Sequence, residues 1–178
     1  MPPYNPYAIP LTNATARLCL GQLFVDGEEY QETDNATRLA HTPGTWMVEN
    51  NGSGLRVHVK PGPDLSKREV ELTVRGRIFA PYRRRVSYIT VSGFTMEHCA
   101  NQYPEGFWWP GSAPQAGAVG CRGGHHWIIE RNRIRHAKTI GIDCGGEGPE
   151  DSDGLGQRSF GTPGYHIIRY NDISNNGA

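Results

Sequence analysis

Asp143 is the residue of this chain whose type and setting point most directly to chemistry. It interrupts an otherwise apolar segment, Ile140-Gly-Ile-Asp-Cys-Gly-Gly, and the glycines after it leave room for a ligand. Hydrolysis of a glycosidic bond requires two carboxyl groups, one acting as acid and the other as base or nucleophile. A carboxyl group on a strand is held more rigidly than one on a loop, which favours a catalytic role. The alternative is that Asp143 only accepts a hydrogen bond from the backbone of a turn.

More acidic residues follow within the next ten positions, and Glu147 is the best candidate for a second catalytic carboxylate inside this chain. The other three are expected to lie on a solvated loop or to bind Ca²⁺ loosely, since carboxylate oxygens are ligands of that ion. They are Glu150, Asp151 and Asp153. Apart from this weak Ca²⁺ alternative, we expect no cofactor.

Candidate substrate-binding residues flank this segment. Tyr103, Trp108 and Trp109 belong to a long Pro/Gly-rich loop, and exposed aromatic rings offer flat apolar faces on which sugars stack. The same rings could instead fold back onto the core. Arg122 could pair with a carboxylate or a sugar acid, and His125, which directly follows Gly123-Gly124, is a further candidate for substrate binding.

Metal ligation is not expected from the histidines or the cysteines. His125 and His126 are adjacent, and strand alternation would point them to opposite faces. The four cysteines do not have the spacing of a zinc site or of a small disulfide scaffold. Alignment of two glycine-rich segments places Cys121 over Cys144, where a disulfide is allowed by geometry but a pair of buried thiols is favoured.

Three segments that could position these residues align with one another without gaps. They start at Tyr88, His126 and Tyr165, which are 38 and 39 residues apart, and read YITVSGFTMEHCAN, HWIIERNRIRHAKT and YHIIRYNDISNNGA. Apolar residues alternate with a period of two, and one irregular step falls at Ser92-Gly93. This pattern is typical of a strand, a tight bend and a second strand.

The repeats predict a solenoid of about three stacked parallel coils over residues 86–178. Corresponding side chains such as Val91, Ile129 and Ile168 would lie about 4.8 Å apart along the stack. Asn132 and Asn171 would stack at a bend, where amide side chains can bond along the ladder. The chain ends inside the third repeat. An exposed solenoid end tends to pair with other strands, so we expect either further coils or a second copy covering this end in a homo-oligomer.

Residues 1–85 have a different pattern and are expected to form a small antiparallel β region with hairpins. The segment from Leu18 to Tyr30 reads as strand, Asp-Gly turn and strand. A second hairpin is expected around Asn50-Asn51-Gly52, and residues 68–79 alternate once more. The fold class predicted for the whole chain is therefore all-β.

Composition excludes several classes of partner. Lys plus Arg equals Asp plus Glu, 18 each, so the formal charge is zero and a nucleic-acid interface is not expected. No window approaches the roughly 18 apolar residues of a membrane span. No signal peptide is visible at the amino terminus.

A family resemblance rests on four strings: QLFVDGEEY, TPGTWMVENNGSGLRVHVK, RIFAPYRRRVSYITVSGFTMEHCAN and GGHHWIIERNRIRHAKTIGID. Over residues 20–178 the chain resembles the N-terminal half of bacterial right-handed parallel β-helix proteins of the pectin-lyase-like type, near glycoside hydrolase family 141. The resemblance implies a secreted or periplasmic enzyme that acts on fucose- or xylose-containing plant polysaccharides. It also implies an acidic residue of functional interest in the segment Gly141-Ile-Asp143, whose partner would lie on a later coil, past Ala178.

Two other functions fit the same fold. A polysaccharide lyase would need a base, for which Lys138 or Arg122 could serve, and usually acidic residues that hold Ca²⁺ near the uronate; no convincing set of three aspartates on adjacent strands is visible. A non-catalytic solenoid that binds a polysaccharide or oligosaccharide is the other alternative. Fold alone does not decide among the three.

Overall fold

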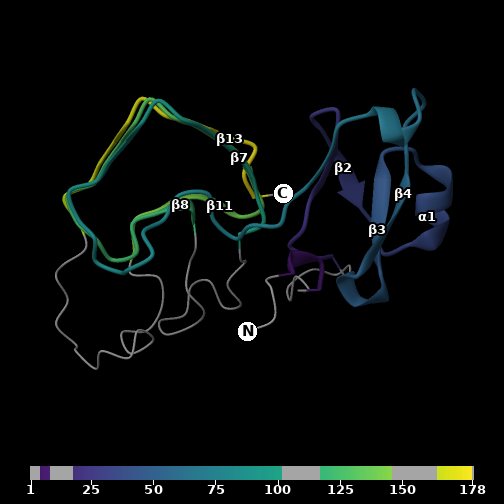
Figure 1. The fold of residues 1–178 in the computed structure, drawn as a ribbon, viewed down its shortest axis with the longest axis horizontal. Coiled ribbons are helices and arrows are strands. Elements are labelled where there is room, and N and C mark those ends of the chain that lie inside the picture. Colours follow the sequence, from purple (N-terminus) through teal and green to yellow (C-terminus); the bar gives the residue numbers. More distant parts are fainter. Residues whose placement is uncertain (1–4, 9–17, 102–116, 146–163, 178) are drawn as a thin grey trace. The chain divides into compact units, whose positions relative to one another are not determined.

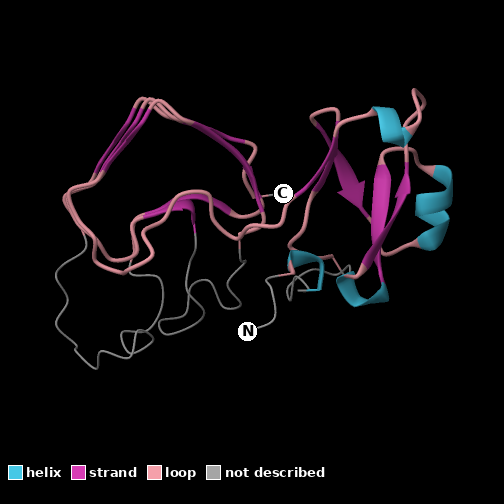
Figure 2. Ribbon diagram, viewed as in Figure 1, coloured by secondary structure: helices cyan, strands magenta, loops and turns pink. Residues whose placement is uncertain are grey.

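The computed structural model describes residues 5–8, 18–101, 117–145 and 164–177. The chain divides into two compact units, Met1–Arg75 and Gly76–Ala178. Strands are the main regular secondary structure in both units, as the ribbon views show (Figures 1 and 2). In the part of the chain that is described, no helix is long and apolar enough to cross a membrane.

The first unit contains a five-stranded sheet with strand order β4-β3-β2-β1-β5. The hairpin expected around the Asp-Gly turn is confirmed: β1 and β2 pair antiparallel, and Asp26 and Gly27 between them have φ of 52° and 76°. The elements are η1 (Pro6–Ala8), β1 (Leu23–Val25), β2 (Glu28–Glu32), α1 (Ala36–His41), β3 (Thr45–Glu49), η2 (Asn50–Gly52), β4 (Gly54–His58), η3 (Leu65–Lys67) and β5 (Val70–Leu72).

The expectation of a purely antiparallel region is wrong at one strand pair. Strands β2 and β3 are parallel, whereas β3 and β4 form the second expected hairpin. A parallel pair needs a crossover connection, and the short helix α1 lies in it. Asn35 begins this helix, since its side chain accepts hydrogen bonds from the backbone N–H groups of Thr37 and Arg38 at 2.9 and 3.1 Å.

The core of the first unit is built around Trp46, whose side chain is 1% exposed. Its indole Nε1 donates to the carbonyl of Tyr30 at 2.9 Å, and the ring of Tyr7 meets it edge-on with centroids 5.8 Å apart. The polar edge of each ring therefore has a partner while its apolar surface is buried.

The second unit consists of parallel sheets built from successive repeats. The strand orders are β12-β9-β6, β13-β10-β7 and β11-β8, and the three repeats follow nearly the same path in Figure 1. The elements are β6 (Thr90–Ser92), β7 (Thr95–Cys99), β8 (Gly117–Gly120), β9 (Ile128–Glu130), β10 (Arg133–Ala137), β11 (Ile140–Asp143), β12 (Ile167–Arg169) and β13 (Asp172–Ser174).

The observed register is the one that the repeat alignment predicts. Ile129 pairs with Val91 on one side and with Ile168 on the other. In the second ladder, Ile134 pairs with both Met96 and Ile173. The same inward positions therefore lie over one another, as in a parallel β-helix.

Residues 76–85, which the sequence pattern grouped with the N-terminal region, make their backbone contacts in the second unit. The N–H groups of Ile78 and Phe79 both donate to the carbonyl of Ala118 at 2.9 Å. Phe79 also forms a parallel bridge with Val119 of β8.

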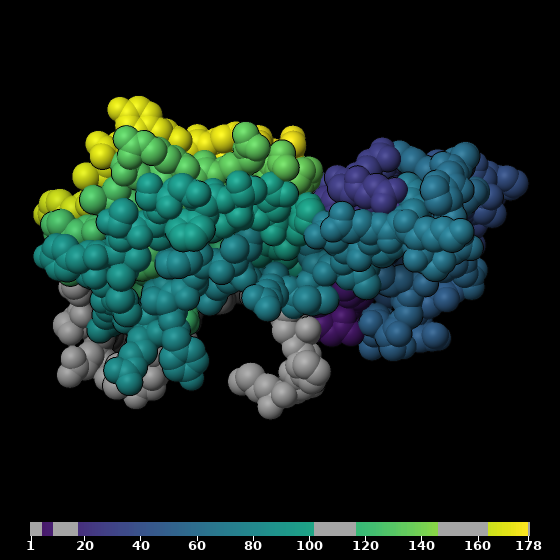
Figure 3. Space-filling view, turned by 45° about the horizontal axis from the view of Figure 1, so that its top comes forward, coloured from purple at the N-terminus to yellow at the C-terminus, as the bar shows by residue number. Residues whose placement is uncertain are grey.

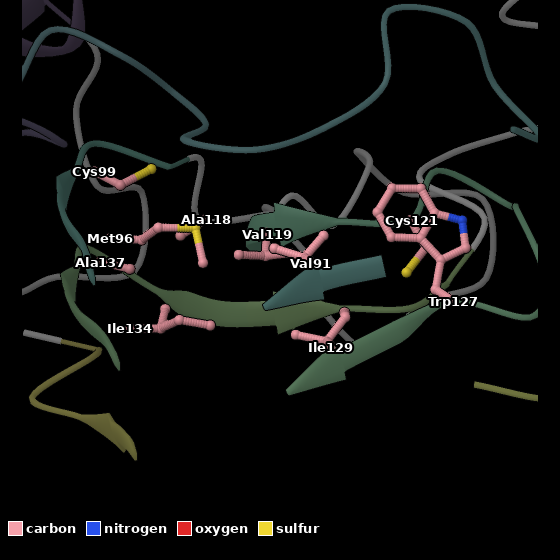
Figure 4. Packing of buried hydrophobic residues seen from close by; sticks show 10 residues of the cluster. All are labelled: Val91, Met96, Cys99, Ala118, Val119, Cys121, Trp127, Ile129, Ile134 and Ala137. Carbon is pink, nitrogen blue, oxygen red and sulfur yellow. The ribbon is translucent and has the colours of Figure 1, made fainter. Parts of the chain in front are cut away.

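Apolar side chains from strands β6 to β11 form the core between the sheets (Figure 4). Val91, Ile129 and Ile134 are 0% exposed. Burial of a side chain of this size contributes about 1.5–3 kcal/mol. Since no repeat can bury its own inward face, the stack rather than any single coil is the stable unit.

The last repeat is only half covered. Ile167 and Ile168 of β12 are each 46% exposed, and Ile173 of β13 is 48% exposed. On the face shown in Figure 3, this repeat lies outermost over the second one. Ile129 and Ile134, which pair with Ile168 and Ile173, are fully buried because the third repeat covers them.

Candidate functional site

Asp143 lies at the end of β11, in register with Gly120 of β8. Its neighbours Ile142 and Cys144 pack against the core. Side chains alternate along a strand, so Asp143 points to the opposite face of the sheet.

The carboxyl group of Asp143 is in an unusual environment. The residue is 7% exposed. Its Oδ1 accepts a hydrogen bond from the Gly145 N–H at 2.9 Å, whereas Oδ2 is buried and has no hydrogen-bond partner among the described residues. Burial raises the pKa of Asp143, and the Gly145 N–H and the charge of Arg77 lower it by smaller amounts. The net effect favours the protonated acid more than in a solvated aspartate.

Arg122 lies in the turn after β8, directly after Cys121, whose N–H donates to the Asp143 carbonyl at 3.0 Å. The guanidinium Nη1 of Arg122 donates to the carbonyls of Pro81 and Tyr82 at 2.9 and 2.8 Å. This side chain therefore anchors the 81–82 segment, a structural contribution that the sequence did not reveal.

Strand alternation predicted that His125 and His126 point to opposite faces. This prediction is wrong, because the two rings lie side by side. His126 has a φ of 56°, in the left-handed region, so the alternation fails at this step. The Nδ1 atoms of the two rings lie 2.8 Å apart, and the ring of His125 meets Tyr88 edge-on at 5.3 Å.

Tyr88, His126 and Tyr165 form an exposed aromatic ladder that was not predicted from the sequence. The His126 ring stacks on Tyr88 at 4.9 Å and on Tyr165 at 5.0 Å, with interplanar angles of 25° and 20°. Tyr88 is 72% exposed and Tyr165 is 77% exposed. The three residues are the first positions of the three aligned repeats, so the alignment already held the signal.

The predicted stacking of Cys121 on Cys144 is confirmed. Their sulfur atoms are 3.6 Å apart, and the two residues do not form a disulfide. The hydrogen bond between the two thiols lowers the pKa of Cys144. His166 joins this pair, and one donor atom from each of the three residues lies within 4.8 Å of the other two.

Four of the predicted site residues lie outside the described residues. They are the second carboxylate candidate, Glu147, and the three loop aromatics, Tyr103, Trp108 and Trp109. The acidic residues Glu150, Asp151 and Asp153 lie outside them as well. Of the predicted site residues, the structure thus brings His125 to the aromatic ladder, whereas the Arg122 side chain contacts the 81–82 segment and not Asp143.

Comparisons with known proteins point to one solved structure. No family model and no curated protein matches the chain. The structure of XylC in complex with xylose is 24% identical with a TM-score of 0.70, and the match covers 98% of this chain and 34% of XylC. The chain has the fold of that part of XylC. It spans about a third of the length of XylC.

Proposed function

We propose that this chain is part of a carbohydrate-active enzyme that hydrolyses glycosidic bonds in a fucose- or xylose-containing plant polysaccharide, with Asp143 as the general acid. The fold shared with XylC, whose structure was solved with xylose, supports a carbohydrate ligand. The observation that carries the proposal is the buried carboxyl group of Asp143, with Oδ2 lacking a hydrogen-bond partner among the described residues.

A general acid must hold a proton at the pH of the reaction and release it to the leaving oxygen. Burial of Asp143 favours the protonated form, the device by which glycosidases keep one of two carboxyl groups neutral. Its Oδ1 is fixed by the Gly145 N–H, which leaves Oδ2 to carry and donate the proton. Since Oδ2 is buried, a substrate reaches it only when the atoms over it move aside.

The second carboxylate of the proposed pair is Glu147 or a residue on a further coil. The distance between the two carboxyl groups would set the stereochemistry, at about 5–5.5 Å for retention and about 6.5–9.5 Å for inversion. A retaining enzyme would use the second carboxylate as nucleophile, whereas an inverting one would use it to activate water.

The leaving group provides the test of the acid role. We would compare the chain and its Asp143→Asn variant on aryl xylosides and fucosides with good and poor leaving groups, and on plant polysaccharides assayed for reducing ends. Loss of a general acid should slow cleavage of poor leaving groups by about 10²–10⁴-fold. Activated aryl glycosides, which need no proton, should be cleaved at nearly the original rate.

Asp172→Asn is the matched control, because Asp172 is an exposed carboxylate of the same unit, 3.4 Å from Arg133. It should leave both substrate classes unaffected. Equal losses on both classes in Asp143→Asn would contradict the acid role. Products with unsaturated ends, detected by their ultraviolet absorbance, would favour the lyase alternative instead.

The aromatic ladder supports a second candidate, a carbohydrate-binding surface without catalysis. Tyr88→Ala or Tyr165→Ala should weaken binding of a xylo-oligosaccharide by roughly two- to tenfold, the equivalent of about 0.5–1.5 kcal/mol per aromatic contact. Calorimetric titration would measure this. Tyr82→Ala is the control, since Tyr82 is 96% exposed and forms no part of the ladder.

A further inference from the structure

Three potential metal ligands meet where successive coils of the second unit lie side by side. Cys121 follows β8, Cys144 follows β11, and His166 precedes β12. Their donor atoms lie within 4.8 Å of one another. Each residue comes from a different strand segment, so the stacking of coils rather than a short motif creates the group.

The spacing of these atoms suits a tetrahedral ion. With Zn–S bonds of about 2.3 Å and a Zn–N bond of about 2.1 Å, two sulfurs of one site lie about 3.8 Å apart and sulfur and nitrogen about 3.6 Å. The two sulfur atoms here are 3.6 Å apart. Only small side-chain shifts are therefore needed to bring the imidazole nitrogen to its place.

The imidazole of His166 has one nitrogen left for a ligand. Its Nδ1 accepts a hydrogen bond from the Trp127 N–H at 3.3 Å, whereas Nε2 is buried and has no hydrogen-bond partner within the described ranges. Binding of an ion through Nε2 would move the ring proton to Nδ1. The Trp127 N–H then loses an acceptor that it holds at the long end of the hydrogen-bond range, and the ring has to turn so that the two N–H groups do not face each other.

We propose that Cys121, Cys144 and His166 bind one zinc ion, with a water molecule in the fourth position. Thiolate and imidazole are ligands that Zn²⁺ prefers, whereas Ca²⁺ takes oxygen ligands. Cys121 is fully buried beside Trp127, as Figure 4 shows, while Cys144 and His166 are half-buried residues nearer the surface of the unit.

The ion would cross-link the coils at this corner. Cys121 and Cys144 follow the paired strands β8 and β11, and His166 comes from the segment that leads into β12. Because the ligands are 22 or more residues apart along the chain, the bound state restricts long loops and should stabilise the folded stack.

The test uses the full chain, reduced and freed of metal by a chelator. Co²⁺ alone should bind with a stoichiometry of one and give the thiolate-to-cobalt charge-transfer band and the strong visible bands of a tetrahedral site. Zn²⁺ should displace it, and Zn²⁺ should raise the thermal midpoint of unfolding. These readouts need no variant and so do not depend on how a variant folds.

Variants then assign the ligands. Cys144→Ser and His166→Gln should each weaken Zn²⁺ binding by at least about 100-fold, since even loss of an outer-shell contact costs about 10–100-fold. Cys99→Ser, which changes a thiol outside the cluster, should bind as the parent does. Circular dichroism confirms that each variant is folded.

Two results would overturn the proposal. One is the absence of a charge-transfer band when Co²⁺ is added to the reduced chain. The other is Zn²⁺ affinity that is unchanged in Cys144→Ser, which would place any bound ion elsewhere. A Cys121–Cys144 disulfide that forms in air, together with no metal binding after reduction, would show that the pair is a redox couple instead.

Discussion

Replacement of Asn132 by alanine should destabilise the second unit more than any surface change. The Asn132 side chain is 3% exposed and sits at the bend between β9 and β10. Its Nδ2 donates to the Val91 carbonyl at 2.9 Å and to Asn171 Oδ1 at 3.1 Å, and its Oδ1 accepts from the Phe94 N–H at 3.0 Å. One amide thus joins three consecutive coils.

The expected loss is about 3 kcal/mol. Each intramolecular hydrogen bond contributes about 1 kcal/mol net, and the variant removes three. The Val91 carbonyl, at a fully buried position, and the Phe94 N–H also lose a partner, so the loss of stability should be at least this large.

Hydrogen exchange measured by mass spectrometry on peptides covering β6 and β7 is the best assay, because it reports the opening of this unit separately from the first one. The Phe94 amide should exchange faster in Asn132→Ala. Ser92→Ala is the control: Ser92 is an exposed residue of the neighbouring strand β6, and its replacement should change the opening free energy by less than about 0.5 kcal/mol.

A loss below about 1 kcal/mol in Asn132→Ala, with Ser92→Ala unchanged, would refute the reasoning. It would mean that the amide ladder contributes to register alone and that apolar burial supplies the stability of the stack.

Three further outcomes are expected. Ile129→Ala, at a core position that is 0% exposed, should lower the unfolding free energy by about 2–5 kcal/mol in chemical denaturation; a loss under about 1 kcal/mol would contradict tight packing there. Burial raises the pKa of Tyr7 from 10.0 to about 12, so the stability it contributes is complete below pH 10.0 and is lost as the pH rises to about 12. Tyr7→Phe should remove that part of the alkaline pH dependence, and an unaltered profile would show that other groups cause it. Burial also raises the pKa of the Cys99 thiol to about 12, so iodoacetamide at neutral pH should leave Cys99 unmodified in the folded protein, as peptide mapping would show.

The sequence by itself determined the stacking of the second unit. The aligned repeats predicted that Val91, Ile129 and Ile168 share one ladder, and they do. The predicted contact between Asn132 and Asn171 is also confirmed. The register was predictable because the alternation of inward and outward side chains is a local property of each strand. Similar coils can bury their equivalent inward positions only when they stack in register.

The tertiary structure decided which side chains meet. Helix α1 and the parallel pairing of β2 with β3 were not visible in the sequence, because a six-residue helix has too few turns to produce a periodic signal. Cys121, Cys144 and His166 follow no short motif. The burial of Asp143 likewise depends on what the fold places over it. Contacts of this kind depend on where long connections return to the stack, and no local pattern of residues encodes the point of return.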